Sequence, residues 1–306
     1  MDIKEGRTLS CDGKNQLYYK IYVPEGERKG VLQVVHGMVE YIGRYDAFMR
    51  EAAERGYLCF GHDHVGHGNT APNAEELGFV AHRGGDHVLV EDVQTVADAV
   101  CREYPFEKRV LLGHSMGSFV ARLYAAEHPE GLAACIFMGT GGGNPAAGAG
   151  KTLAGTIRAF RGERHRSQFL NRMMFGSYNK KTENLTGRDW LTKEIDVQRA
   201  YDADPFCTYL FTVSATQDLL NLLTGCNAQS WYEKLDRNLP VYLVSGAEDP
   251  VGGYGKGPQE IRDRLIETGH TDVTLRLWEG DRHEVLNETD RDAVKRELFD
   301  WIAAKI

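Results

Sequence analysis

A serine between two glycines is the first residue of this chain whose setting suggests chemistry. Residues 113–117 read Gly-His-Ser-Met-Gly, after the short run Arg109–Leu112 and before a segment of helical spacing. Glycine two positions to each side permits a tight strand-to-helix turn that exposes a nucleophile. The turn also sets Ser115 at a helix N-terminus, where unpaired N–H groups stabilise developing negative charge. The pattern predicts that Ser115 is a nucleophile; a solvated serine in an ordinary glycine-rich turn is the alternative.

A serine hydroxyl is a poor nucleophile until a base takes its proton, and the base itself needs an orienting acid. His283 follows the strand-like run Val273–Leu277, and Asp249 follows the run Val241–Val244. The carboxyl ends of parallel strands meet at one edge of a sheet, so we expect both side chains to lie near Ser115. The spacing predicts His283 as the base, with a structural histidine in a surface loop as the alternative.

Two adjacent carboxylates compete for the role of the orienting acid. Glu248 and Asp249 both follow the same strand-like run, and Asp249 directly precedes Pro250. That position favours Asp249 as the acid. Glu248 is then expected to make a structural hydrogen bond.

An acyl transfer through a tetrahedral intermediate also needs two preset donors for the oxyanion. One is expected to be the backbone N–H of Met116, directly after the nucleophile. The other is expected from the loop after the strand-like run Val31–Val35, where residues 36–38 read His-Gly-Met, and the N–H of Met38 is our choice. This chemistry calls for no metal and no organic cofactor.

The elements that must position these residues alternate between two patterns. Most strand-like runs are short and largely apolar, Val31–Val35 is also rich in β-branched residues, and Leu17–Val23 alternates; the stretches between such runs have an amphipathic helical period. The strand-like runs are Leu17–Val23, Val31–Val35, Tyr57–Phe60, Arg109–Leu112, Ala133–Met138, Val241–Val244 and Val273–Leu277. The helical stretches are Tyr45–Arg55, His87–Glu103, Ser115–His128, Gln259–Thr268 and Asp292–Ala304. The alternation predicts an α/β fold with a mostly parallel sheet flanked by helices.

The alternation is interrupted in the middle of the chain. Residues 141–145 read Gly-Gly-Gly-Asn-Pro, and from there to about residue 228 the pattern is helical without a clear strand. A helical block between two halves of one sheet is more economically explained as an insertion than as a separate domain. We therefore expect residues 1–140 and 229–306 to form one core and residues 141–228 to form a helical cap.

Composition limits the class of partner. The 306 residues carry a net charge of −8, which disfavours a nucleic-acid partner because such binding depends on a basic surface. No segment approaches the roughly 18 apolar residues that a membrane helix requires. The N-terminus is charged, without the apolar stretch of a secretory signal, and the six cysteines show no close pairing. These features predict a cytoplasmic protein with reduced thiols.

Two other motifs suggest chemistry that the spacing does not support. Residues 62–67 read His-Asp-His-Val-Gly-His, but Gly66 occupies the place where a metallohydrolase cluster of this form has an aspartate. Residues 148–152 read Gly-Ala-Gly-Lys-Thr, but Pro145 replaces the first glycine of a phosphate-binding loop. We expect the histidines and Asp63 to stabilise a loop by hydrogen bonds, and no phosphate site.

With these residues assembled, the chain resembles the monoglyceride lipase and lysophospholipase branch of the α/β-hydrolases, also called the serine aminopeptidase S33 group. The matching segments run in family order over nearly the whole chain: 36–37, 63–68, 113–117, 245–252 and 282–288. Segments 176–179, 189–192 and 204–207 are similar to the cap of bacterial members. Two residues depart from the family pattern: Thr70 stands where a serine is common, and Met38 where a small residue is common.

The resemblance implies an α/β-hydrolase fold with a lid, and hydrolysis of monoacylglycerol-like or lysophospholipid-like esters. Apolar residues of the middle segment are candidates for an acyl-chain channel, and packing of the lid onto the core is their alternative role. The substrate is expected to be a small-molecule ester, with transient membrane-surface contact through the cap. A peptidase that removes N-terminal residues, a zinc-dependent hydrolase and a catalytically silent binding protein remain alternatives.

Overall fold

A single eight-stranded sheet runs through the molecule, and the computed structural model describes all 306 residues. The strands lie in the order β1-β2-β4-β3-β5-β6-β7-β8, with antiparallel pairing only at β1–β2 and β2–β4. Their bounds are β1 Asp2–Leu9, β2 Gln16–Val23, β3 Gly30–Val35, β4 Tyr57–His62, β5 Arg109–His114, β6 Leu132–Met138, β7 Val241–Gly246 and β8 Val273–Trp278. The predicted α/β fold with a mostly parallel sheet is confirmed.

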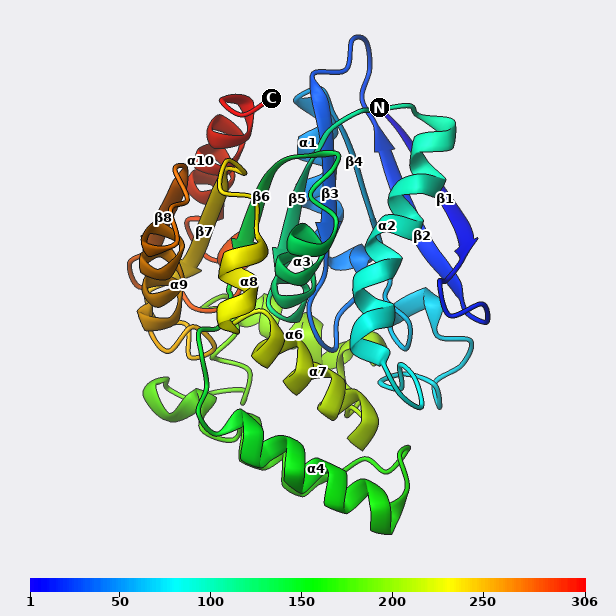
Figure 1. The fold of residues 1–306 in the computed structure, drawn as a ribbon, viewed down its shortest axis with the longest axis vertical. Coiled ribbons are helices and arrows are strands. Elements are labelled where there is room, and N and C mark those ends of the chain that lie inside the picture. Colours follow the sequence, from blue (N-terminus) through cyan, green and yellow to red (C-terminus); the bar gives the residue numbers. More distant parts are fainter.

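Helices cover both faces of this sheet (Figure 1). One face packs against α1 (Asp46–Glu54) and α10 (Arg291–Ala303), which contribute Phe48 and Phe299 to the core on that side. The other face packs against α2 (Gly85–Glu103), α3 (Met116–Glu127), α8 (Gln229–Lys234) and α9 (Lys256–Glu267). With both faces covered, the central strands β4, β5 and β7 are buried along their whole length, as parallel strands require.

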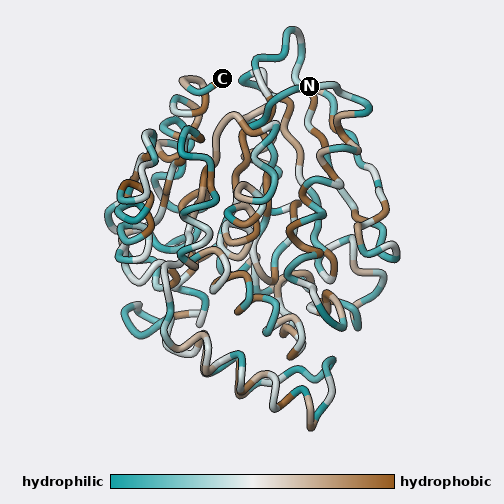
Figure 2. Tube along the Cα trace, viewed as in Figure 1, coloured by the Kyte–Doolittle hydropathy of each residue, from teal (hydrophilic) through white to brown (hydrophobic).

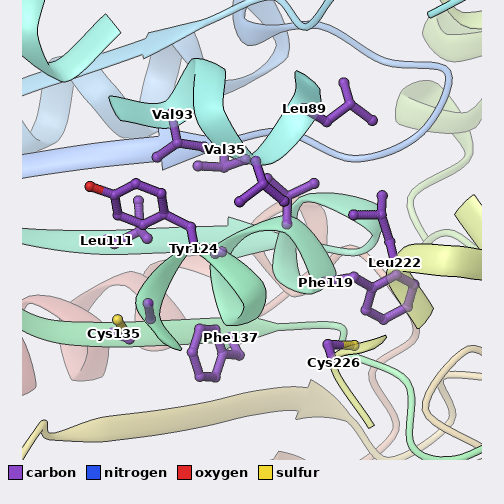
Figure 3. Close-up of a cluster of buried hydrophobic side chains, with 14 of the residues drawn as sticks. Val35, Leu89, Val93, Leu111, Phe119, Tyr124, Cys135, Phe137, Leu222 and Cys226 are labelled. Atoms are coloured by element: carbon purple, nitrogen blue, oxygen red, sulfur yellow. The ribbon is translucent and has the colours of Figure 1, made fainter. Parts of the chain in front are cut away.

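The larger of the two cores lies between the sheet and α2 and α3. Val35, Leu111 and Phe137 project from the strands into a cluster that includes Val93 and Phe119 from the helices (Figure 3). Apolar residues follow the strands and the inward faces of the helices, and hydrophilic residues follow the outer turns (Figure 2). No helix has both the length and the apolar character needed to cross a membrane.

Four helices follow β6 before α8 and the return to the sheet at β7. These are α4 (Ala147–Arg161), α5 (Gln168–Phe175), α6 (Ile195–Ala203) and α7 (Val213–Gly225). Helix α7 packs against α2 and α3, and its Leu219 and Leu222 join the larger core. Helix α4 packs on α7 and lies farthest from the sheet, at the bottom of Figure 1. These helices fall within the stretch 141–228 for which a cap is predicted.

Candidate active site

Ser115 occupies the turn between β5 and α3 in a strained backbone conformation. Its φ is 54° and its ψ is −123°, a region that residues with a side chain rarely adopt. The two flanking glycines make this turn possible. A Cβ on Gly113 would lie 2.3 Å from the carbonyl oxygen of Gly117, and a Cβ on Gly117 would lie 2.2 Å from that of Val35. The turn therefore packs too closely against β3 and α3 for any other residue at either position.

His283 and Asp249 form a buried pair at the same edge of the sheet. Nδ1 of His283 lies 3.0 Å from Oδ2 of Asp249, and the two side chains are 2% and 0% exposed. Asp249 also accepts hydrogen bonds from the N–H of Val251 at 2.8 Å and the hydroxyl of Ser245 at 3.3 Å. A carboxylate only accepts hydrogen bonds, so Nδ1 is the donor and Nε2 is left as the basic nitrogen of the ring.

The neighbouring carboxylate, Glu248, does not contact the histidine. Its side chain is 53% exposed, and its nearest charged partner is Arg282, at 3.9 Å. Of the two candidate acids, only Asp249 is brought to His283. The loops that carry them touch directly, because a Cβ on Gly246 would lie 2.1 Å from the carbonyl oxygen of Arg282.

Ser115 and His283 line one cavity, but no hydrogen bond joins the hydroxyl to the ring in this structure. The backbone at the end of β6 restricts the ring. Gly139 at the end of β6 lies against it, since a Cβ there would come within 3.1 Å of Cε1 of His283. Hydrogen bonds between nucleophile and base are often long in the absence of substrate and shorten in the reactive complex.

The predicted oxyanion loop packs directly against the serine. A Cβ on Gly37 would lie 2.9 Å from the Cβ of Ser115, so the backbone of residues 37–38 passes beside the nucleophile. Met116 is the first residue of α3, where helical N–H groups have no partner within the helix. The N–H of Met38, in the loop after β3, has no backbone acceptor. Both predicted donors therefore border the same cavity as Ser115.

A buried charge network lies behind the oxyanion loop, and sequence reasoning did not find it. Arg44 donates to both carboxylate oxygens of Glu284 at 2.7 Å and to Oε2 of Glu40 at 2.8 Å. Glu40 also accepts from the Tyr45 hydroxyl at 2.9 Å, from the backbone N–H of Gly37, and from Nδ1 of His114 at 3.1 Å. The network therefore ties the oxyanion loop to residue 284, next to the base.

The charges in this network shift one another's protonation. Burial would lower the pKa of His114, but the hydrogen bond and negative charge of Glu40 outweigh it, so the pKa lies above its usual value. Burial would raise the pKa of Glu40, yet His114 and Arg44 hold it well below its usual range. Glu40 is thus an ionised acceptor that fixes the N–H of Gly37 in place. The sequence signal that could have identified Glu40 is its position, three residues after the pair His36-Gly37.

The cavity at this edge has a volume of about 1280 Å³. Ser115, His283 and Met38 line it. Many of the other lining residues come from the 141–228 stretch, and their apolar members include Leu153, Met174, Phe175, Leu219, Leu220 and Leu223. Small-molecule sites combine an apolar lining with a few polar groups, and this cavity exceeds their usual volume of roughly 300–1,000 Å³.

The histidine-rich loop after β4 lies beneath the oxyanion loop. Asp63 accepts hydrogen bonds from the N–H groups of Ile42 and Asn69, each at 2.7 Å, so this carboxylate shapes the loop as expected. Nε2 of His36 accepts from the N–H of His64 at 3.0 Å. The Gly-Ala-Gly-Lys-Thr segment forms part of helix α4.

The sheet is mostly parallel and covered by helices on both faces. A strained serine follows β5, and a histidine–aspartate pair lies at the same edge of the sheet. These features define an α/β-hydrolase, here a serine-type carboxylic-ester hydrolase. The model of one particular family, the serine aminopeptidase S33 family, matches residues 26–290. The chain belongs to this family.

Similar proteins of known name fall in the same group. The monoglyceride lipase homolog of Monkeypox virus is 34% identical over 296 residues, covering 95% of each chain. The monoacylglycerol lipase of Mycolicibacterium smegmatis is 25% identical over 297 residues, covering 96% of this chain and 95% of that one. The solved structure of a thermostable carboxyl esterase from Bacillus coagulans, in complex with glycerol, is 30% identical with a TM-score of 0.93, covering 100% of this chain and 99% of that one.

Proposed function

We propose that this chain hydrolyses esters of a single acyl chain with a small polar alcohol, of the monoacylglycerol or lysophospholipid kind. The observation that supports the proposal is that Ser115, His283, Met38 and Met116 line one cavity, together with apolar residues of the 141–228 stretch. The names of the relatives from Monkeypox virus and M. smegmatis support the same substrate class.

In this proposal Ser115 attacks the acyl carbonyl while Nε2 of His283 takes its proton. The N–H groups of Met38 and Met116 donate hydrogen bonds to the developing oxyanion. His283 then gives the proton to the leaving alcohol, and water repeats the sequence on the acyl-enzyme to release the acid. Asp249 holds the imidazole through Nδ1, at 3.0 Å, and stabilises the positive ring that forms in each half of the reaction.

The acyl chain is proposed to lie along the apolar walls beneath the 141–228 stretch, which then acts as a cap over the site. Phe119 of α3 and Leu219 and Leu223 of α7 line this part of the cavity. The glycerol or phosphate head group is proposed to contact polar lining residues, including Asn171, Arg172 and Lys180. Met38 on the oxyanion side narrows the entrance relative to a small residue.

A peptidase that removes N-terminal residues needs an acidic side chain that is free to bind the substrate's amino group. Of the glutamates that line the cavity, Glu40 and Glu284 are paired with Arg44, and Glu260 lies 3.8 Å from Arg264. That pairing favours ester hydrolysis over removal of N-terminal residues. The chemistry proposed uses only side chains and backbone groups of this chain.

We further propose a cytoplasmic enzyme that meets lipid surfaces transiently through its cap. Large apolar side chains stand exposed there: Phe160 is 85% exposed, Leu185 68% and Phe169 64%. An interfacial contact through such residues would let an acyl chain pass from a membrane or micelle into the cavity.

A substrate panel tests the proposal. The purified chain is assayed with monoacylglycerols and lysophospholipids of matched chain length, p-nitrophenyl esters, and aminoacyl amides, each with and without a chelator. We expect hydrolysis of the esters, insensitivity to chelator, and negligible turnover of the amides. Faster cleavage of aminoacyl amides, or loss of activity with chelator, would replace this function with a peptidase or a metal-dependent one.

A further inference from the structure

Residues 189–208, called here the inner cap segment, contact both catalytic loops. The segment lies within the 141–228 stretch and includes α6. It hydrogen-bonds the oxyanion loop on one side and the loop that carries His283 on the other. Covering a cavity does not require hydrogen bonds to both loops, so these contacts indicate that the segment also positions the loops.

On the oxyanion side, the contact falls on a strained residue. Val39 follows the proposed donor Met38 and has a φ of 55°, in the left-handed region that a β-branched residue strongly disfavours. Its carbonyl oxygen accepts a hydrogen bond from the hydroxyl of Tyr201, at 2.8 Å. The peptide between Val39 and Glu40, one residue beyond Met38, is therefore held by a group from the cap while Val39 keeps its unfavourable conformation.

Tyr201 is itself held in place. Its side chain is 7% exposed and packs with Leu191 and Cys207. The guanidinium carbon of Arg44, from the buried charge network, lies 4.9 Å from the centre of its ring. The hydroxyl therefore has little freedom to follow Val39 if that residue relaxes.

On the base side, the strip 190–193 runs alongside the loop of His283. The N–H of His283 donates to the carbonyl of Trp190 at 3.3 Å, and the N–H of Glu284 donates to that of Leu191 at 2.7 Å. The hydroxyl of Thr192 donates to the carbonyl of Asn287 at 3.0 Å. The ring of Trp190 also lies against the imidazole, with centres 5.1 Å apart.

We propose that the inner cap segment positions both catalytic loops, and that Tyr201 is the positioning residue of the oxyanion loop. The inference rests on the proposed ester hydrolysis, because only a reaction with an oxyanion needs this loop preset. The free energy contributed by a single buried hydrogen bond is comparable to the free-energy cost of holding one residue in the left-handed region. Removing the hydroxyl therefore lets Val39 relax and turns the N–H of Met38 away from the oxyanion.

The direct test is Tyr201→Phe, which keeps the ring and its packing. Loss of an entire oxyanion donor costs about 10²–10³ in kcat, so partial misplacement of one is expected to cost about tenfold. KM for a monoacylglycerol should change less than twofold, because the substrate's ground-state contacts remain. Tyr232→Phe is the matched control: this tyrosine is also buried, lies on α8, and its hydroxyl has no partner. It should retain full kcat.

A double-mutant cycle with Val39→Gly distinguishes positioning from any other effect of the hydroxyl. Glycine adopts a positive φ without strain, so the loop no longer needs the tyrosine to hold it. Tyr201→Phe is expected to lower kcat less than threefold when it is added to Val39→Gly. Comparable thermal unfolding of all variants shows that each is folded.

The outcomes separate this inference from the proposed function. If the wild-type chain does not hydrolyse esters, the proposed function fails. If it does, and Tyr201→Phe leaves kcat unchanged or raises only KM, then Tyr201 does not position the loop and the inference is overturned. An equal fall in kcat with and without Val39→Gly would also overturn it, because the hydroxyl would then act independently of the strained residue.

Discussion

Two carboxylates stand next to each other in the chain and have different environments. Asp249 is 0% exposed and bonds to Nδ1 of His283, whereas Glu248 is 53% exposed and faces Arg282. A buried carboxylate that holds a ring in one tautomer contributes to every proton transfer the ring performs. An exposed one at the rim contributes little.

We therefore expect Asp249→Asn to reduce kcat by about 10⁴-fold, because an amide no longer selects the working tautomer of the imidazole. Glu248→Gln, one position away, should keep kcat within threefold of wild type. Steady-state kinetics on a p-nitrophenyl ester measures both. The acid would have to be reassigned if the two variants lost activity equally.

Asp281 is a second buried carboxylate, two residues before the base. Burial, together with the negative charges of Glu288 and Asp290, raises its pKa from 3.8 to about 7, although Lys193 lies 3.3 Å away and opposes the shift. Between these two pH values the folded protein binds a proton that the unfolded chain has lost. The free energy of unfolding therefore falls as pH rises from about 4 to about 7.

Asp281→Asn removes this titration and leaves a neutral side chain of the same shape. The difference in melting temperature, variant minus wild type, should be more positive at pH 8 than at pH 5, because only the wild type loses stability over this range. Scanning calorimetry at the two pH values measures this difference directly. A variant whose relative melting temperature is the same at both values would show that Asp281 is ionised in the folded state throughout.

Ser115, Asp249 and His283 could be predicted from the sequence as site residues because each follows a recognisable apolar run, at the end of a predicted strand. The structure brings Asp249 and His283 to 3.0 Å. The same reasoning did not find Glu40, Arg44 and Glu284. The Arg44–Glu284 ion pair joins positions 240 residues apart in the chain, and no local pattern encodes which distant charge a buried arginine meets.

At the level of elements, the turn between β5 and α3 shows how closely the sheet and the helix approach. Gly117 sits in the first turn of α3, directly over the carbonyl oxygens of Val35 and His36 in and after β3. Side chains at this position would push the helix away from the sheet. The position of Ser115 is thus set by the contact between two elements.

Gly117→Ala places a Cβ 2.2 Å from the carbonyl oxygen of Val35, so helix and strand must separate. We expect a loss of about 3 kcal/mol in the free energy of unfolding, with a large fall in kcat. Gly148→Ala in α4 meets no atom within 4 Å and is the control. It should be neutral or stabilising by up to about 1 kcal/mol, since alanine favours helix. Urea unfolding of both variants tests the contrast.

Element boundaries were predicted well inside the sheet and less well at its edge. The apolar runs at β3, β5 and β7 are buried on both faces, which gives a clear signal. Strand β1, Asp2–Leu9, was not predicted, because at the edge of the sheet it is only partly buried and its residues are largely polar. Helix α9 begins at Lys256, three residues before the predicted start, in a stretch that includes Gly257 and Pro258.

On the scale of the whole molecule, one arginine joins the two ends of the 141–228 stretch to the core. Arg122 on α3 is fully buried and donates to the carbonyl oxygens of Gly141 and Cys226 and to the side chain of Asn227. Asn227 in turn donates to the carbonyl of Gly141, at 3.2 Å. The two ends of the 141–228 stretch, the proposed cap, are thus fastened at one point beside helix α3.

Arg122→Met keeps a long side chain but leaves these buried acceptors without a donor. We expect a loss of about 2–4 kcal/mol in the free energy of unfolding. Hydrogen exchange should rise at residues 140–144 and 225–228 more than in the strands. Uniform exchange across the chain would contradict a local fastening point.

The central claim is that Ser115 forms the acyl-enzyme. Its most direct test is to react the folded chain with a fluorophosphonate and to locate the adduct by mass spectrometry of peptides. We predict a single stoichiometric adduct on Ser115, no adduct on Ser115→Ala, and loss of nearly all ester hydrolysis in that variant, since removal of such a nucleophile costs about 10⁶-fold in well-studied cases. An adduct on another residue, or more than a tenth of wild-type activity in Ser115→Ala, would contradict the account.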